Sequence, residues 1–91
     1  MKNNEGKYKP TLIYKSFIEA LANVRQFGVD KHGNKEDWRT TNSILHYDAC
    51  LRHIYAALDN EELDKESGLL HLAHAACNLM FLIEEKCTKM K

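Results

Sequence analysis

Three polar residues interrupt an otherwise apolar stretch between Leu69 and Ile83, and their types and spacing suit them to chemistry. They are His71, His74 and Asn78. At about 100° per residue they fall on one narrow face of a helix that is apolar on its other sides. Imidazoles with pKa values near neutrality can bind phosphate or a metal ion. The pattern predicts either one wall of a ligand site or a buried stripe whose hydrogen bonds are satisfied inside the protein.

A second set of candidate side chains lies in the preceding helical pattern. His46, Cys50 and His53 share one face there, apart from the apolar side of the same helix. If that face turned toward the two later histidines, four imidazoles would surround one pocket.

An acidic turn at residues 59–68 separates the two patterns. Its carboxylates Glu61, Glu62, Asp64 and Glu66 could hold Mg²⁺, which prefers carboxylate oxygens and keeps several waters. An acidic turn also favours the start of the next helix, because carboxylates suit a helix N-terminus. The spacing matches no calcium-binding loop.

The irregular stretch at residues 28–42 is long for a small domain, and such loops are often functional. It contains the only tryptophan, Trp38, beside Arg39, together with Lys31. Tryptophan and arginine can stack on a base, and lysine and arginine can meet phosphate. The equally strong alternative is that Trp38 anchors the loop to the core.

These side chains must be positioned by helices, and the periodicity predicts three of them. The first is expected at residues 16–27, with Ser16 and Glu19 as a capping box and Gly28 as its end. The second begins near Thr41–Ser43 and ends near Leu58, and the third covers residues 68–86. We expect an all-α, three- to four-helix domain over residues 11–86, with a flexible N-terminal arm at 1–10 and a frayed tail at 87–91.

The length of 91 residues limits the core that the chain can build. Two short helices would hardly cover a third helix that is apolar almost all round. We therefore predict a homo-oligomer, in which the interface carries part of the site.

The charge balance and cysteine pattern exclude several classes. Lys and Arg number 13 and Asp and Glu number 13, without a long run of either sign, which argues against general nucleic-acid binding. The cysteines form no CxxC pair and are expected to be reduced thiols rather than structural zinc ligands. No signal sequence is present and the apolar stretch is too short to span a membrane, so a cytoplasmic protein is expected.

Several segments together resemble a known family. They are FGVDKHG (27–33), Trp38, LRH (51–53), EELDKESG (61–68), HLAHAACN (71–78) and FLIEE (81–85). They resemble the phage-associated family described as the dATP/dGTP diphosphohydrolase N-terminal domain, over roughly residues 9–85. The segment ESGLLHLAHAACN is the most specific part of the match.

The resemblance implies an all-helical fold related in function to MazG-type pyrophosphatases, which cut (d)NTPs into monophosphate and pyrophosphate with Mg²⁺. It also implies a phage or prophage origin, and so the cytoplasm of an infected bacterium. Asp64, with Glu62 or Glu66, would hold Mg²⁺. Phosphates would be held by Arg52 and Lys31. The other matching positions are Trp38 and Asn78 for the ligand, and His53, His71 and His74 for positioning water.

The chain departs from the expected pattern in two places. Its third helix offers His71, His74 and Asn78 where MazG-type enzymes carry carboxylates, and the family's usual Arg/Asp-bearing segment after Lys-Pro is absent. Both departures weaken the expectation of hydrolysis more than the expectation of nucleotide binding. One alternative is a non-catalytic phage protein that sequesters a nucleotide or a nucleotide-derived immune signal. Others are a purely structural helical oligomer and, more weakly, a zinc site formed by His53, His71 and His74.

Overall fold

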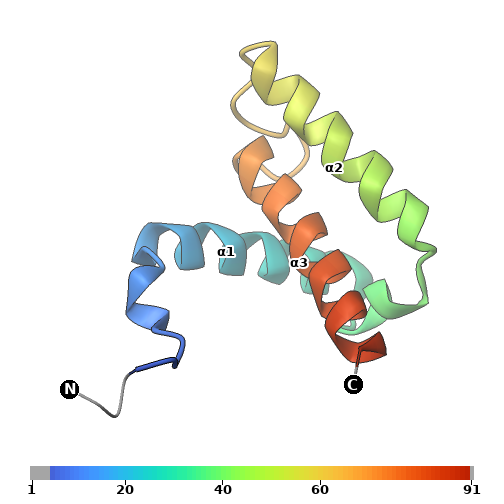
Figure 1. Cartoon of the computed structure of the whole chain (residues 1–91). Coiled ribbons are helices and arrows are strands. Elements are labelled where there is room, and N and C mark those ends of the chain that lie inside the picture. Colours follow the sequence, from blue (N-terminus) through green and yellow to red (C-terminus); the bar gives the residue numbers. More distant parts are fainter. Residues whose placement is uncertain (1–4, 91) are drawn as a thin grey trace.

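The computed structural model describes residues 5–90, and this part of the chain is all-α (Figure 1). The elements are η2 (Pro10–Leu12), α1 (Lys15–His32), η3 (Asp37–Thr40), α2 (Ser43–Leu58) and α3 (His71–Lys89). Within these residues the extended structure is limited to an isolated bridge between Leu63 and Leu70. No helix described here has the length and apolar character needed to cross a bilayer. The predicted all-α class is confirmed.

Helix α3 is the element that both other helices contact (Figure 1). Val24 of α1 packs against Ala73 and Cys77 of α3 in a small buried cluster. On another side of α3, the buried Cys50 thiol of α2 approaches the Ala75 carbonyl at 3.6 Å. The small side chains on α3 let both neighbours approach its backbone closely. α2 runs antiparallel to α3, while α1 crosses it.

The boundaries of α1 differ from those predicted. The helix begins at Lys15 with Tyr14 as an N-cap that makes no side-chain capping bond, so the expected capping box is wrong: Ser16 already lies inside the first turn. Gly28 does not end the helix, since the half-buried residues on both sides of it, Phe27 and Val29, hold this turn in place. Gly33, with φ of 81°, takes the left-handed C-cap position, and its N–H donates to the Val29 carbonyl at 2.6 Å.

The second helix begins where it was expected, because the Asn42 side chain caps it by accepting from the Ile44 N–H. α3 begins at His71 rather than residue 68, since the Leu63–Leu70 bridge keeps the preceding chain extended. It continues to Lys89, so the first residues of the expected tail are helical. Residues 1–4 of the expected arm and residue 91 of the tail lie outside the described residues.

The surface is larger than a compact chain of this length would have. The accessible area is 7230 Å², whereas scaling with size gives about 5,400 Å². The radius of gyration is 15.0 Å, against about 12 Å expected. Part of the excess belongs to the segment before α1, where Leu12 and Tyr14 are exposed. Another part is an apolar outer face at helical spacing on α2 and α3, formed by Tyr47, Leu51, Tyr55, Leu72, Leu79 and Ile83.

We expect a second copy of the chain to cover this outer face, because a group of large apolar side chains exposed at helical spacing is typical of a surface that is buried in an interface. Replacing Leu51 and Leu79 together by glutamate should shift the protein from an oligomer to a monomer without loss of helicity. Both side chains are 46% exposed in the single chain, so the added carboxylates can reach solvent there. Multi-angle light scattering after gel filtration measures the mass.

Leu45→Glu provides the matched control. Leu45 is also exposed on α2, at 54%, but lies off the outer face, so this variant should keep the wild-type mass. A wild-type protein that is monomeric at all concentrations would contradict the expected oligomer.

Candidate functional site

An open pocket of about 430 Å³ lies where α1, η3, α2 and α3 meet. Helix α3 contributes His74 and Asn78 to its wall, and α2 contributes His46 and His53. Three of the four predicted imidazoles therefore line one pocket. The fourth, His71, is buried and contacts His53.

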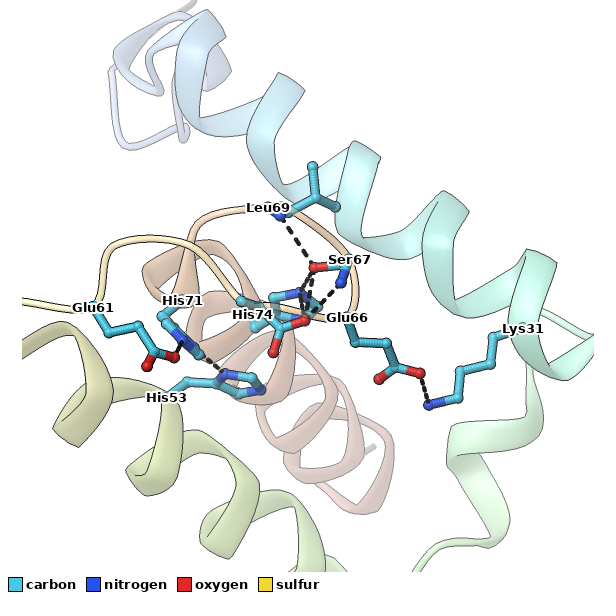
Figure 2. A network of polar contacts seen from close by, with 9 residues as sticks. Lys31, His53, Glu61, Glu66, Ser67, Leu69, His71 and His74 are labelled. Carbon is cyan, nitrogen blue, oxygen red and sulfur yellow. Dashed lines mark hydrogen bonds and ion pairs between the residues drawn. The ribbon is translucent and has the colours of Figure 1, made fainter.

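A cluster of polar side chains at one end of the pocket joins α2, the α2–α3 connection and α3 (Figure 2). We call it the His/Asp cluster. It consists of His53 from α2, Glu61, Asp64 and Ser67 from the connection, and His71 and His74 from α3. Residues distant in sequence are thus held together by charge-assisted and neutral hydrogen bonds.

Glu61, His71 and His53 form the first chain of hydrogen bonds in this cluster. His71 Nε2 lies 2.7 Å from Glu61 Oε2, and His71 Nδ1 lies 2.8 Å from His53 Nδ1. The carboxylate only accepts, so Nε2 of His71 carries a proton. In neutral His71 the Nδ1 then accepts from Nδ1–H of His53. This order leaves Nε2 of His53 without a proton and therefore basic.

Asp64, Ser67 and His74 form the second chain. Ser67 donates its hydroxyl proton to Asp64 Oδ2 at 2.9 Å, and the Ser67 N–H donates to the same oxygen. The hydroxyl oxygen accepts from the Leu69 N–H and lies 2.7 Å from His74 Nε2. Because Ser67 has a single hydroxyl proton, His74 must donate from Nε2. Gly68, with φ of 73°, allows the turn that brings the Leu69 carbonyl back to the Asp64 N–H.

The surroundings favour the neutral forms of His53 and His74 and the charged form of Asp64. Burial lowers the pKa of His53, and the neighbouring His74 and His71 lower it further. Burial also lowers the pKa of His74, and the opposing effect of Asp64 does not reverse this. Burial raises the pKa of Asp64, but the two Ser67 hydrogen bonds and the nearby imidazoles outweigh it and leave that pKa below its ordinary value.

The other end of the pocket is aromatic. Trp38 stacks on Phe81 with ring centroids 4.5 Å apart. The Arg25 guanidinium lies over the Phe81 ring, 5.1 Å from its centroid. The buried His46 contacts the Trp38 carbonyl through Nε2 at 3.1 Å. Trp38 thus anchors its loop and also lines the pocket. Between the two ends, Asn78 Oδ1 is buried without a hydrogen-bond partner among residues 5–90.

The predicted cations and carboxylates are not all brought together. Lys31 lines the pocket and pairs with Glu66 at 2.8 Å, whereas Arg52 is exposed and is absent from the pocket lining. Glu62 is exposed, and its carbonyl accepts from the His71 N–H. Sequence reasoning missed Ser67, Arg25 and Phe81, and it named Glu61 as a possible Mg²⁺ ligand rather than as a partner of His71. Ser67 and Phe81 lie in the segments that carried the resemblance, so those segments contained a signal for them.

The donor set of the cluster does not suit a magnesium ion held by the protein alone. Among the described residues, one group offers three potential ligand atoms within 4.8 Å of one another, from His53, Asp64 and His71. This group has two nitrogens and one carboxylate, whereas Mg²⁺ prefers oxygen ligands. Glu66 is engaged by Lys31 and does not join the group.

Burial also prevents two of the thiols from acting as metal ligands or nucleophiles. Cys50 and Cys77 are both buried and free, and burial raises the pKa of Cys77 to about 11. A thiol with so high a pKa is neither a nucleophile nor a metal ligand near neutral pH.

The fold and the site define a small all-α domain with an aromatic pocket and a His/Asp cluster at its end. The chain belongs to the family described as "dATP/dGTP diphosphohydrolase, N-terminal", whose model matches residues 1–91. It is 35% identical over 82 residues to a protein of Salmonella phage PMBT28 named dATP/dGTP diphosphohydrolase. The match covers 90% of this chain but 28% of that relative. No solved structure matches the chain.

The lowered pKa values of His53 and His74 predict that acid destabilises the chain. Their folded pKa values lie below the ordinary value of 6.5, so the unfolded chain binds these protons more tightly. The stability that depends on neutral imidazoles is therefore complete above about pH 6.5 and is lost as the pH falls through the window below it. Urea unfolding in a chelator-containing buffer at about pH 7.5 and about pH 5.5 measures the loss.

In His74→Gln, whose amide can still donate to Ser67, the loss of stability between the two pH values should be smaller than in the wild type. His32→Gln, at an exposed position of α1, should behave like the wild type. Equal losses in all three proteins would contradict this explanation.

Proposed function

We propose that this chain binds a purine (d)NTP in the pocket and takes part in its hydrolysis to monophosphate and pyrophosphate. The observation that carries the proposal is the division of one pocket into an aromatic end with an unpartnered amide and a polar end with a basic imidazole. Membership of the diphosphohydrolase family supports a nucleotide as the ligand. The volume of about 430 Å³ falls in the range of about 300–1,000 Å³ typical of small-molecule sites.

The base would occupy the aromatic end. Leaving a buried acceptor unpaired costs about 1–3 kcal/mol, so Asn78 Oδ1 favours a ligand that supplies an N–H group. Adenine offers its exocyclic amine, and asparagine is a common partner of that base edge. Phe81 and Trp38 supply the apolar surface beside it.

The phosphates would lie toward Lys31 at the end of α1. Its ion pair with Glu66 is about half exposed on both sides, and such pairs contribute little to stability. A polyphosphate would therefore compete with Glu66 for this ammonium group at small cost.

Hydrolysis would use the basic Nε2 of His53, which the chain to His71 and Glu61 leaves unprotonated. This nitrogen would take a proton from water as the water oxygen attacks the α-phosphorus. The bond between the α-phosphorus and the bridging oxygen breaks, and pyrophosphate leaves with its electron pair. Asp64 lines the same pocket and would orient the water.

To test the proposal, the purified protein is incubated with each (d)NTP, with and without Mg²⁺, and the products are separated by chromatography. Monophosphate and pyrophosphate from purine substrates are expected. Asp64→Asn should abolish turnover and leave the circular dichroism spectrum unchanged. The absence of both turnover and nucleotide binding would end the proposal.

Binding is tested separately by calorimetry. Lys31→Ala should weaken nucleotide binding about tenfold, equivalent to about 1.4 kcal/mol, because a phosphate contact is lost. Asn78→Leu should weaken it by at least about tenfold, because the N–H group of the base loses its acceptor. Lys15→Ala removes the same charge at the opposite end of α1 and should bind like the wild type.

A second candidate is a binder that sequesters a nucleotide or a nucleotide-derived immune signal without cutting it. The scarcity of carboxylates around Asp64 favours this candidate, because MazG-type hydrolysis relies on several of them. Heat-denaturing the loaded protein and identifying the released species separates the two. An intact ligand in proportion to protein would support the binder and exclude turnover.

A further inference from the structure

Two imidazole nitrogens at the base of the His/Asp cluster face each other directly. His53 Nδ1 and His71 Nδ1 are 2.8 Å apart and share one proton. Two imidazole nitrogens bound to one metal ion at about 2.1 Å would lie about 3.0 Å apart at a right angle and about 3.4 Å apart in a tetrahedron. An ion could thus replace the shared proton if the nitrogens separate by a few tenths of an ångström and each ring turns until its lone pair points at the ion.

Glu61 prepares His71 for such a role. Its carboxylate accepts from Nε2–H of His71 at 2.7 Å, and His71 is 6% exposed. Metal-binding histidines commonly donate their other ring N–H to a carboxylate, which fixes the tautomer and makes the free nitrogen more basic. The buried ring is therefore oriented with its Nδ1 lone pair toward the position between the two histidines.

Asp64 supplies the third potential ligand. Both Ser67 hydrogen bonds go to Oδ2, which fixes the carboxylate and leaves Oδ1 without a bond to Ser67. Ligand atoms of His53, Asp64 and His71 all lie within 4.8 Å of one another. His53 and Asp64 also line the pocket, so an ion there would be reached from solvent and would keep positions for water or phosphate.

We propose that His53, Asp64 and His71 form a site for a first-row transition-metal ion such as Zn²⁺ or Co²⁺, in preference to Mg²⁺, with Glu61 as the outer partner of His71. Two imidazoles and one carboxylate are the donor set that such ions favour. On binding, His53 carries its proton on Nε2 instead of Nδ1, and the Nδ1 lone pair joins the ion, so the metal-bound form of His53 and the form that would act as a base in hydrolysis exclude each other. The total number of protons on the ring is unchanged.

This inference goes beyond the proposed nucleotide function and is tested without any nucleotide. A chain that binds the ion but no nucleotide keeps the metal site and loses the proposed function. A chain that binds nucleotide but no transition metal keeps the proposed function and loses the metal site.

The probe is Co²⁺, added to chelator-treated protein and followed by its visible absorption. We expect one Co²⁺ per chain, displaced by an equal amount of Zn²⁺ and retained in a large excess of Mg²⁺. His71→Gln and Asp64→Asn should each weaken Co²⁺ binding at least about tenfold. Glu61→Gln, which acts on the outer partner, should weaken it by about 10–100-fold. Circular dichroism verifies that each variant is folded.

Two control variants separate Co²⁺ binding at this site from Co²⁺ binding at other side chains. His32→Gln removes an exposed histidine that lines the same pocket but is not one of the three proposed ligands, and this variant should bind Co²⁺ like the wild type. Cys87→Ser removes the exposed thiol, and its spectrum should be unchanged. Three results would overturn the inference: no Co²⁺ binding, ready displacement by Mg²⁺, or folded His71→Gln and Asp64→Asn variants with wild-type affinity.

Discussion

The structure depends on the need to satisfy buried imidazoles at the start of α3. His71 is buried between α2 and the α2–α3 connection, where water cannot satisfy its nitrogens. Its two bonds, to Glu61 and His53, therefore determine how the connection and α2 lie against α3. The Asp64–Ser67–His74 bonds add a second constraint on the same connection. The site and the helical hairpin are held by the same contacts.

The sequence predicted the helices and much of the polar end, because both follow from periodicity. The spacing of His74 and Asn78 identified the pocket face of α3, and the spacing of His46 and His53 identified that of α2. Periodicity has no equivalent for a connection without a repeating conformation. Glu61 and Asp64 were therefore predicted only as carboxylates that could hold a metal ion, and the hydrogen bond between His71 and Glu61 was not predicted.

The unpredicted end of α1 and the exposed position of Arg52 have a common physical origin. Gly28 satisfied the local rule for a helix end, but packing of the surrounding turn outweighed its low helix propensity, of about 1 kcal/mol relative to alanine. Arg52 and His53 lie together in the segment LRH (51–53), yet consecutive helical residues point about 100° apart. His53 therefore lines the pocket while Arg52 is exposed. Local sequence cannot reveal either result without the neighbouring helix.

The short sequence separations between hydrogen-bonded residues at the polar end have a consequence for the order of folding. The bonded residues are separated by 18 positions between His53 and His71, and by 10 between Glu61 and His71. Such short loops close at low entropic cost and form early. The aromatic end instead needs Arg25 of α1 to reach Phe81 of α3, which closes a much longer loop. The α2–α3 hairpin could therefore assemble its imidazoles first, and docking of α1 would then create the cavity around chemistry already in place.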